Sequence, residues 1–219
     1  MFGVGRVAVS IESTPKKAFA SAADWPGWAR AGRTEEQALE ALADYAVRYA
    51  AVADLAGEPF APASYEIVNR VTGGASTDFG VPSAITDLDR RPVTATEAER
   101  RANLADAAWA VFDRIAVGGP AELRKGPRGG GRDRDKMIGH VISSDHAYAR
   151  EIGHRGPEPE AHDRAAIRAE RDGVLEILRR PSDGAALAGR RWTTRYAAHR
   201  IAWHALDHAW EMEDRAVPG

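Results

Sequence analysis

The feature that most constrains the fold is a change of pattern near residue 93. From that point to the C-terminus, apolar residues recur at helical spacing in four segments that glycine and proline separate. These segments cover residues 96–117, 133–152, 162–179 and 194–214. Helices of comparable length, with a short link between the last two, favour an antiparallel arrangement. The sequence therefore predicts an antiparallel four-helix bundle over residues 94–219.

The N-terminal third of the chain has a strand-rich pattern instead. Runs of β-forming and alternating apolar residues predict strands at residues 3–12, 16–21, 28–32 and 65–71. A helix is expected to begin at Thr34, with Gln37 three residues later as in a capping box, and to continue to about Ala56. We therefore predict an α+β protein. Its parts are a small β-β-β-α-β domain at 1–72, a connector rich in small and polar residues at 73–93, and the bundle.

Composition excludes several classes of protein and of site. The formal net charge of -2 over 219 residues lacks the basic footprint of a nucleic-acid binder. No apolar run approaches the roughly 20 residues of a membrane span, and the first residues lack the layout of a signal peptide, so we expect a cytoplasmic protein. The chain has no cysteine, which excludes disulfides, thiolate metal sites and cysteine nucleophiles. Any metal must be held by histidine, carboxylate or water.

The strongest candidate for chemistry is the pair His204 and His208 in the last predicted helix. Residues four apart lie on one helical face, about 5–6 Å apart at Cβ. The other residues of that face are apolar or small, so both imidazoles need partners. A shared metal ion is one solution, and hydrogen bonds to carboxylates are the other. Ala205 stands where the helical metalloprotease motif has glutamate, so no general base is built in there.

A third ligand is expected from a facing helix, and residues 133–152 offer His140 and His146. Helical periodicity does not choose between these two. Asp145 lies within the apolar stripe of that segment, where it either accepts a hydrogen bond from a ligand histidine or binds an arginine or a tyrosine hydroxyl. Asp207, between the two histidines of the last helix, is a further candidate for supporting a ligand or a substrate. The remaining histidines, His154, His162 and His199, are expected at the surface.

Two other features have a structural and a functional interpretation. Trp203, Leu206 and Trp210 form a second apolar strip roughly opposite the histidines, expected to pack against the N-terminal domain or a partner subunit. Such a strip is compatible with a homodimer. Residues 124–134 are rich in glycine and arginine, typical of a solvated loop. Alternatively, arginines such as Arg128 and Arg132 hold a carboxylate or phosphate at the start of the following helix.

Residues 192–214, WTTRYAAHRIAWHALDHAWEMED, resemble the last helix of the DinB/YfiT superfamily, and Met137-Ile138-Gly139-His140 resembles its second helix. The resemblance covers about residues 94–216. It implies a four-helix bundle with a divalent metal (zinc, nickel or iron) held by His140, His204 and His208, and so selects His140 over His146. It also implies a transferase or hydrolase that acts on a small molecule, with a low-molecular-weight thiol or water as the activated group.

Residues 18–42, AFASAADWPGWARAGRTEEQALEAL, are similar to the HicB-like domain, with Gln37 in a position that is usually acidic. HicB proteins usually neutralise a toxin and often add a DNA-binding tail, which is not evident in this chain. The resemblance implies an alternative function. Residues 1–72 would recognise a protein partner, and the helical part, with or without a structural metal, would be a scaffold.

Overall fold

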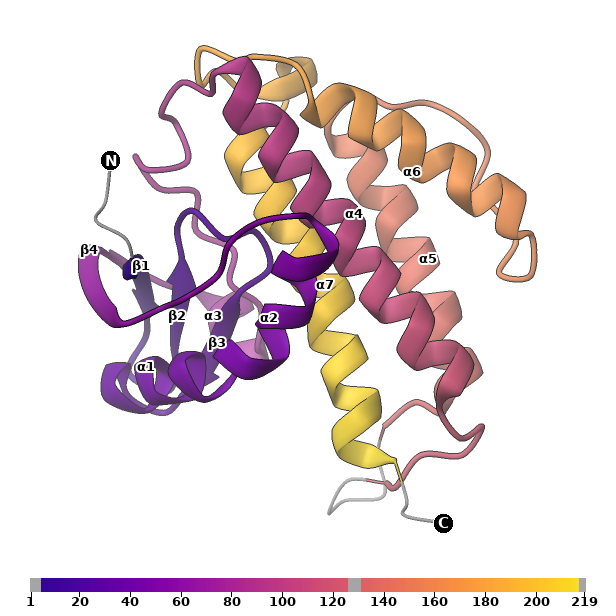
Figure 1. Ribbon diagram of the computed structural model, residues 1–219, viewed down its shortest axis with the longest axis horizontal. Coiled ribbons are helices and arrows are strands. Elements are labelled where there is room, and N and C mark those ends of the chain that lie inside the picture. The colour runs from indigo at the N-terminus through magenta and orange to yellow at the C-terminus, as the bar shows by residue number, and fades with distance from the viewer. Residues whose placement is uncertain (1–4, 126–130, 217–219) are drawn as a thin grey trace.

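The computed structural model describes residues 5–125 and 131–216 and has a mixed α+β fold (Figure 1). A four-stranded sheet near the N-terminus precedes the long helices, as the sequence predicts. The strands are β1 (Arg6–Ser13), β2 (Ala18–Ala22), β3 (Ala29–Gly32) and β4 (Ser64–Thr72). The helices are α1 (Glu35–Asp44), α2 (Ala46–Leu55), α3 (Ala75–Phe79), α4 (Ala95–Gly118), α5 (Arg134–Glu151), α6 (Arg164–Leu178) and α7 (Thr194–Arg215). A short 3₁₀ helix covers Leu187–Gly189.

The sheet has the strand order β3-β2-β1-β4. Strand β1 pairs antiparallel with β2 and parallel with β4, while β2 and β3 pair antiparallel. Because β1 is central, its residues Val7, Ala8, Val9 and Ile11 are all buried. Helix α2 packs against α4. Helix α1 packs against β2 and β3, and α7 meets the opposite face through Trp203, which lies with Phe19 and Ala29. The sheet is therefore enclosed on two sides.

The prediction of one continuous helix over residues 34–56 is wrong. The chain bends at Tyr45 and forms two helices, α1 and α2. The Tyr45 ring packs edge-on against Trp210 with ring centroids 5.1 Å apart, and its hydroxyl donates to Asp214 at 2.9 Å. The Arg30 guanidinium lies over the same ring at 3.9 Å. These distant contacts fix Tyr45 and turn the chain there. The predicted start is confirmed, since the Thr34 side chain accepts from the Gln37 N–H.

The segment between the sheet and the long helices has more order than its composition indicates. It contains α3, and it is tied to β1 by the buried carboxylate of Glu12. That carboxylate accepts from the Thr77 hydroxyl at 2.5 Å and from the Ser83 and Ala84 N–H groups at 3.0 and 2.9 Å. Residues 73–93 are thus anchored on the sheet.

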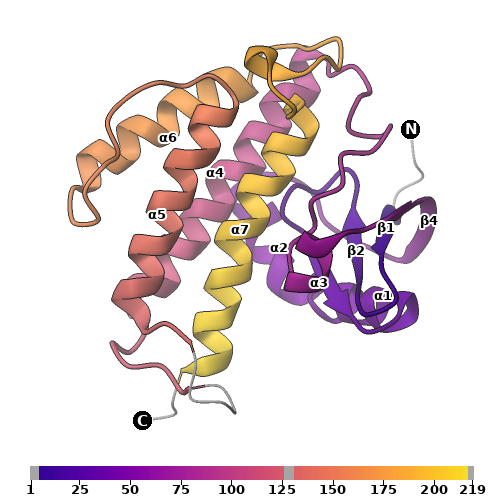
Figure 2. The same cartoon turned by 180° about the vertical axis from the view of Figure 1, so that it is seen from behind.

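The four long helices predicted after residue 93 are all present, with ends that differ by at most two residues from the prediction. Helix α4 packs against α6 and α7, and α5 also packs against α6 and α7. Seen from behind, α5 and α7 lie side by side (Figure 2). Asp133 immediately precedes α5, but its carboxylate accepts from the Leu123 N–H and does not cap the helix. Within the described ranges, no helix is both long enough and apolar enough to cross a membrane.

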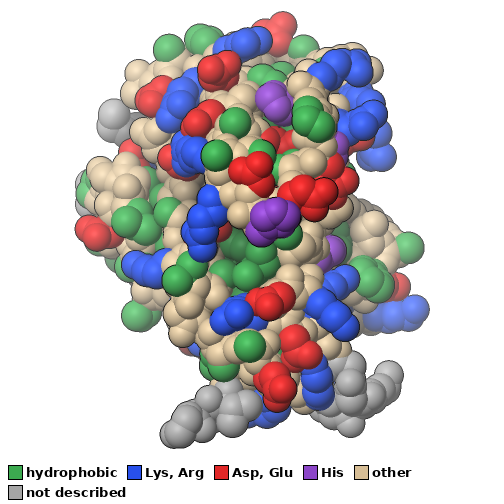
Figure 3. All heavy atoms as spheres, turned by 90° about the vertical axis from the view of Figure 1, so that its right-hand side faces the viewer, with side chains coloured by type: hydrophobic (Ala, Val, Ile, Leu, Met, Phe, Trp, Pro, Cys, Tyr) green, Lys and Arg blue, Asp and Glu red, His purple; other side chains and the backbone are tan. Residues whose placement is uncertain are grey.

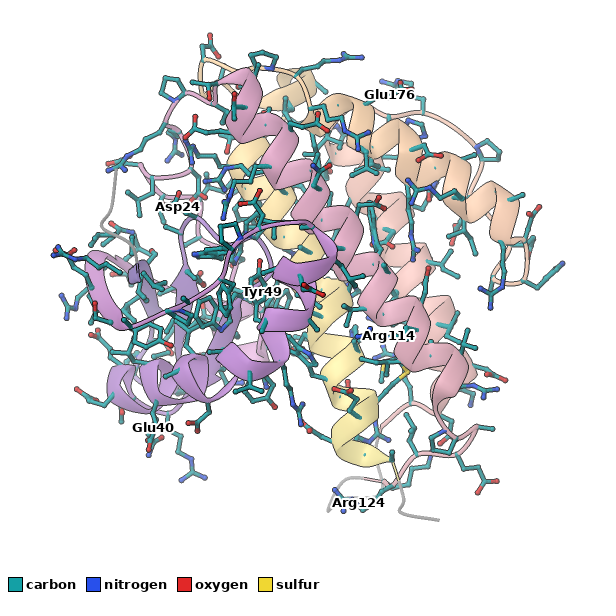
Figure 4. All side chains as sticks on the ribbon, viewed as in Figure 1. Asp24, Glu40, Tyr49, Arg114, Arg124 and Glu176 are labelled. Carbon is teal, nitrogen blue, oxygen red and sulfur yellow. The ribbon has the colours of Figure 1, made fainter. Side chains whose placement is uncertain are left out.

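The apolar strip of α7 packs against the sheet, which confirms the first of its two predicted partners. The Trp203 ring meets Phe19 edge-on with centroids 6.2 Å apart. At Gly27, with φ +90, an added Cβ would lie 2.8 Å from Leu206 Cδ1, so only glycine allows this close approach. Buried side chains from both parts of the chain form one cluster, and Tyr49 lies among them (Figure 4). Since the strip is covered, it no longer supports a homodimer, which stays a prediction.

The surface seen from the right-hand side of Figure 1 mixes charges of both signs (Figure 3). Acidic and basic side chains are interspersed on it, and apolar side chains gather near its centre. Ion pairs link neighbouring helices in this part of the molecule, such as Arg168 with Asp106 at 2.7 Å and Arg171 with Asp113 at 2.7 Å. Charged side chains thus join α6 to α4 at the edge of their apolar contact.

Candidate metal centre

Three histidines from two helices lie together between α5 and α7. Nε2 of His140 on α5 is 3.3 Å from Nε2 of His204 on α7. The centroid of the His208 ring lies 4.9 Å from that of His140 and 4.6 Å from that of His204. One ring nitrogen from each residue lies within 4.8 Å of those of the other two. This cluster could hold a metal ion, and it contains His140 and not His146.

The spacing of the ring nitrogens suits a tetrahedral ion. Zinc–nitrogen bonds of about 2.0–2.1 Å at a tetrahedral angle place two ligand nitrogens about 3.3–3.4 Å apart. The Nε2 atoms of His140 and His204 have this separation. One ring nitrogen of His208 lies within 4.8 Å of the ligand atoms of the other two rings. Without an ion, the same 3.3 Å distance corresponds to a long hydrogen bond between the two imidazoles.

The protonation states of the cluster also suit a cation. Burial, with a smaller contribution from His208, lowers the pKa of His140 to about 4. Burial lowers the pKa of His204 well below its ordinary value, and only 6% of this residue is exposed. Its Nδ1 atom is buried and has no hydrogen-bond partner in the described part of the chain. Both imidazoles are therefore neutral at pH 7, the form that binds metals.

A carboxylate that the sequence reasoning missed orients the third histidine. Glu211, three residues after His208 on α7, lies 3.0 Å from its Nδ1. The other Glu211 oxygen accepts from Arg215 at 2.6 Å. The hydrogen bond with His208 lowers the pKa of Glu211, so the carboxylate stays charged and holds the proton on Nδ1. Nε2 is then left free for a metal. The helical spacing of three residues could have pointed to this pair.

The other two acidic candidates have partners away from the cluster. Asp145 accepts from the Trp109 indole N–H at 2.9 Å and lies 3.8 Å from Arg171. Of the predicted partners of Asp145, the arginine is therefore the one that lies beside it. Burial raises the pKa of Asp145 to about 7. Asp207 pairs with Arg30 of β3 at 3.1 Å, on the side of α7 that faces the sheet. Both carboxylates therefore support packing between elements.

The remaining candidates differ in position. Arg128 lies outside the described residues. Arg132 is exposed, and its charge contributes to the lowered pKa values of His140 and His204. His146 pairs with Glu170 of α6 at 2.6 Å. The expectation that His199 is a surface residue is wrong, because its Nε2 is buried without a partner in the part of the chain that is described, and burial lowers its pKa to about 4.

Comparisons with known proteins assign no family to the chain. No family model, no curated protein and no solved structure matches it. The resemblances to the DinB/YfiT superfamily and to the HicB-like domain therefore remain expectations drawn from short motifs. The case for a metal centre depends on the geometry of the three histidines.

Proposed function

We propose that the protein is a metal-dependent enzyme of the DinB type. In this proposal α4, α5, α6 and α7 form an antiparallel four-helix bundle, and His140, His204 and His208 hold a divalent metal inside it. One observation carries the proposal: three imidazoles from two helices converge within 4.8 Å. Burying such groups without full hydrogen bonding costs free energy, which a bound cation would offset. The 3.3 Å separation of the His140 and His204 Nε2 atoms supports two of the three ligands, because one tetrahedral ion needs a separation of about this size.

The proposed reaction either joins a small-molecule substrate to a thiol or hydrolyses such a substrate with water. Three histidine ligands leave at least one coordination position open. A divalent metal bound by them lowers the pKa of a thiol or water at that position, so that a nucleophile forms near neutral pH. Neutral imidazoles suit zinc, nickel and iron. The chain contributes the ligand geometry, the orientation of His208 by Glu211, and the burial of His204 that restricts water.

Metal analysis of purified protein tests the ligand assignment. The wild type and the variants His140→Ala, His204→Ala and His208→Ala are compared with His162→Ala, which changes an exposed histidine outside the cluster. We expect stoichiometric zinc, nickel or iron in the wild type and in His162→Ala. Each ligand variant should lose most of the metal under the same dialysis. Stoichiometric metal in all three ligand variants would contradict the assignment.

Cobalt substitution distinguishes a catalytic from a purely structural metal. Co²⁺ reports its coordination through its visible absorption spectrum, and an open position lets a small thiol change that spectrum. We expect 2-mercaptoethanol to change the spectrum of the Co²⁺-loaded protein in a saturable way. A spectrum that no thiol or anion alters, together with a melting temperature that falls on chelation, would favour a metal that only stabilises the fold.

A further inference from the structure

Next to the histidine cluster, α5 and α7 bring together a tyrosine and an arginine. Arg200 precedes His204 by four residues, so the two share a face of α7 and are separated by a rise of about 6 Å. The Tyr148 ring on α5 packs edge-on against the His204 ring with centroids 5.5 Å apart. Arg200 Nη2 donates to the Tyr148 hydroxyl at 3.0 Å. The pair therefore lies about one helical turn from the proposed metal.

The surroundings of the half-buried Arg200 guanidinium differ from those of the buried arginines of the fold. Arg101 and Arg195 both lie near Asp24, at 3.0 and 3.7 Å, and Arg171 pairs with Asp113. Within residues 5–125 and 131–216, Arg200 pairs with no carboxylate. Its polar contacts are the Tyr148 hydroxyl and the Pro82 carbonyl, at 3.0 and 3.4 Å. Donor capacity is left over, because a guanidinium has five N–H groups.

Aromatic rings hold this arginine in place. The guanidinium carbon lies 4.9 Å from the Trp203 ring centroid and 5.3 Å from that of Tyr148. The Tyr148 ring in turn packs against Trp192 at 5.1 Å. A guanidinium stacked on aromatic rings is pre-organised for a planar, two-pronged contact with a carboxylate. Since the tyrosine oxygen accepts from Arg200, its own O–H proton can donate to the same ligand.

Building on the proposed metal-dependent function, we infer that Arg200 and Tyr148 bind the carboxylate of a small thiol whose sulfur occupies the open metal position. Both side chains are only partly buried, so they remain accessible to a small ligand. The distance of about one helical turn suits a thiol whose carboxylate is a few bonds from sulfur. This assigns recognition of the acidic group to α5 and α7, whereas the sequence pointed to the loop of residues 124–134.

The inference is tested with two matched thiols on the Co²⁺-loaded protein. 3-Mercaptopropionate and 3-mercapto-1-propanol have the same chain length and differ in the carboxylate. Titrations followed by visible absorption should show that the wild type binds the acid about 10- to 100-fold more tightly than the alcohol. Arg200→Gln should abolish this preference, Tyr148→Phe should reduce it, and Arg200→Lys should retain part of it. Arg114→Gln, which changes an exposed arginine of α4, is the matched control and should keep it.

Several results would overturn the inference. Equal binding of the two thiols by the wild type would overturn it while leaving the proposed metal site intact. A preference lost in Arg132→Gln but kept in Arg200→Gln would assign the carboxylate to the loop instead. Failure of the wild-type protein to take up Co²⁺ would overturn both this inference and the proposed function. If Arg200→Gln does not fold, Arg200→Lys and Tyr148→Phe decide, and an unchanged preference in both would also overturn it.

Discussion

The two sides of α7 carry opposite kinds of contact. On the side facing the sheet, Trp203, Leu206 and Trp210 are buried, with Trp203 against Phe19 and Leu206 against Gly27. On the side facing α5, His204 and His208 meet His140. The first side is closed by apolar packing within the chain. On the second side, ring nitrogens face one another, and the buried Nδ1 of His204 has no partner among the described atoms.

This difference shows how one helix can be fixed and reactive at once. The apolar contacts with the sheet set the rotation of α7, and that rotation points the histidines at α5. Rigid elements hold functional groups more accurately than loops do. If this account holds, changes on the sheet side should lower the stability of the fold, and changes on the α5 side should lower metal affinity. The following variants separate these two effects.

The largest effect on stability is expected from Trp210→Ala. Trp210 is 1% exposed and packs against Tyr45, so its removal leaves a cavity where α7 meets the junction of α1 and α2. We expect a loss of about 3–5 kcal/mol in the free energy of unfolding, measured by urea denaturation. Val47→Ala, at a residue that is 84% exposed, is the control and should change stability by less than about 0.5 kcal/mol. A loss below about 1 kcal/mol for Trp210→Ala would contradict the role of this contact.

The next effect depends on pH and concerns His199. Its pKa in the fold is about 4, below the ordinary 6.5, so the unfolded chain takes up a proton first as the pH falls. Stability is therefore lost between pH 6.5 and 4, by at most about 3 kcal/mol. In metal-free protein, the fall in the free energy of unfolding between pH 7 and 4.5 should be about 2 kcal/mol smaller for His199→Gln than for the wild type. Urea denaturation at both pH values measures this, and equal losses would contradict it.

Glu211→Gln tests the side of α7 that faces α5. The substitution weakens the contact that fixes the proton on His208 Nδ1, so we expect metal affinity to fall about 10- to 100-fold with stoichiometry kept at saturation. Competition with a chelator of known affinity measures the change. Glu213→Gln alters a glutamate of the same helix whose ion-pair partner is Arg48 at 3.9 Å, and it should leave the affinity unchanged. Equal metal affinities for Glu211→Gln and Glu213→Gln would contradict a role of Glu211 in orienting His208.

The smallest effect is expected from Arg30→Gln on the sheet side. Arg30 pairs with Asp207 at 3.1 Å and covers the Tyr45 ring, but both charged groups keep some contact with water. We expect a loss of about 1 kcal/mol in unfolding free energy, with metal content unchanged. Thermal denaturation and metal analysis of the same sample give both values. A variant that keeps its stability but loses its metal would contradict the division between the two sides of α7.

Local pattern was enough to predict most of the secondary structure. The four long helices have apolar periodicity between glycine and proline stops, and both signals lie within the segments themselves. The bend at Tyr45 could not be predicted in this way. Its causes are Arg30, Trp210 and Asp214, of which the last two lie far away in the sequence. The anchoring of residues 73–93 by Glu12 likewise depends on a pairing between distant segments.

The candidate centre was only partly accessible from the sequence. The spacing of His204 and His208 identifies a shared helical face, but periodicity left His140 and His146 equal. The choice between them depends on how α5 is rotated, which places His146 beside Glu170 of α6. The partner of Asp145, Trp109, comes from α4, 36 positions earlier, so no local pattern indicates it. Pairing across helices decides these roles.

The close contact between Gly27 and α7 has a practical consequence for anyone who divides this chain into fragments. A clone that begins at residue 94 would expose three large apolar side chains on one helix to water, and the recombinant product should aggregate. The reciprocal fragment would lose the surface that covers Phe19 and Ala29. The sheet and the long helices should therefore be expressed together, because either part alone exposes the interface between them. For the same reason, recombination should transfer both parts as one unit.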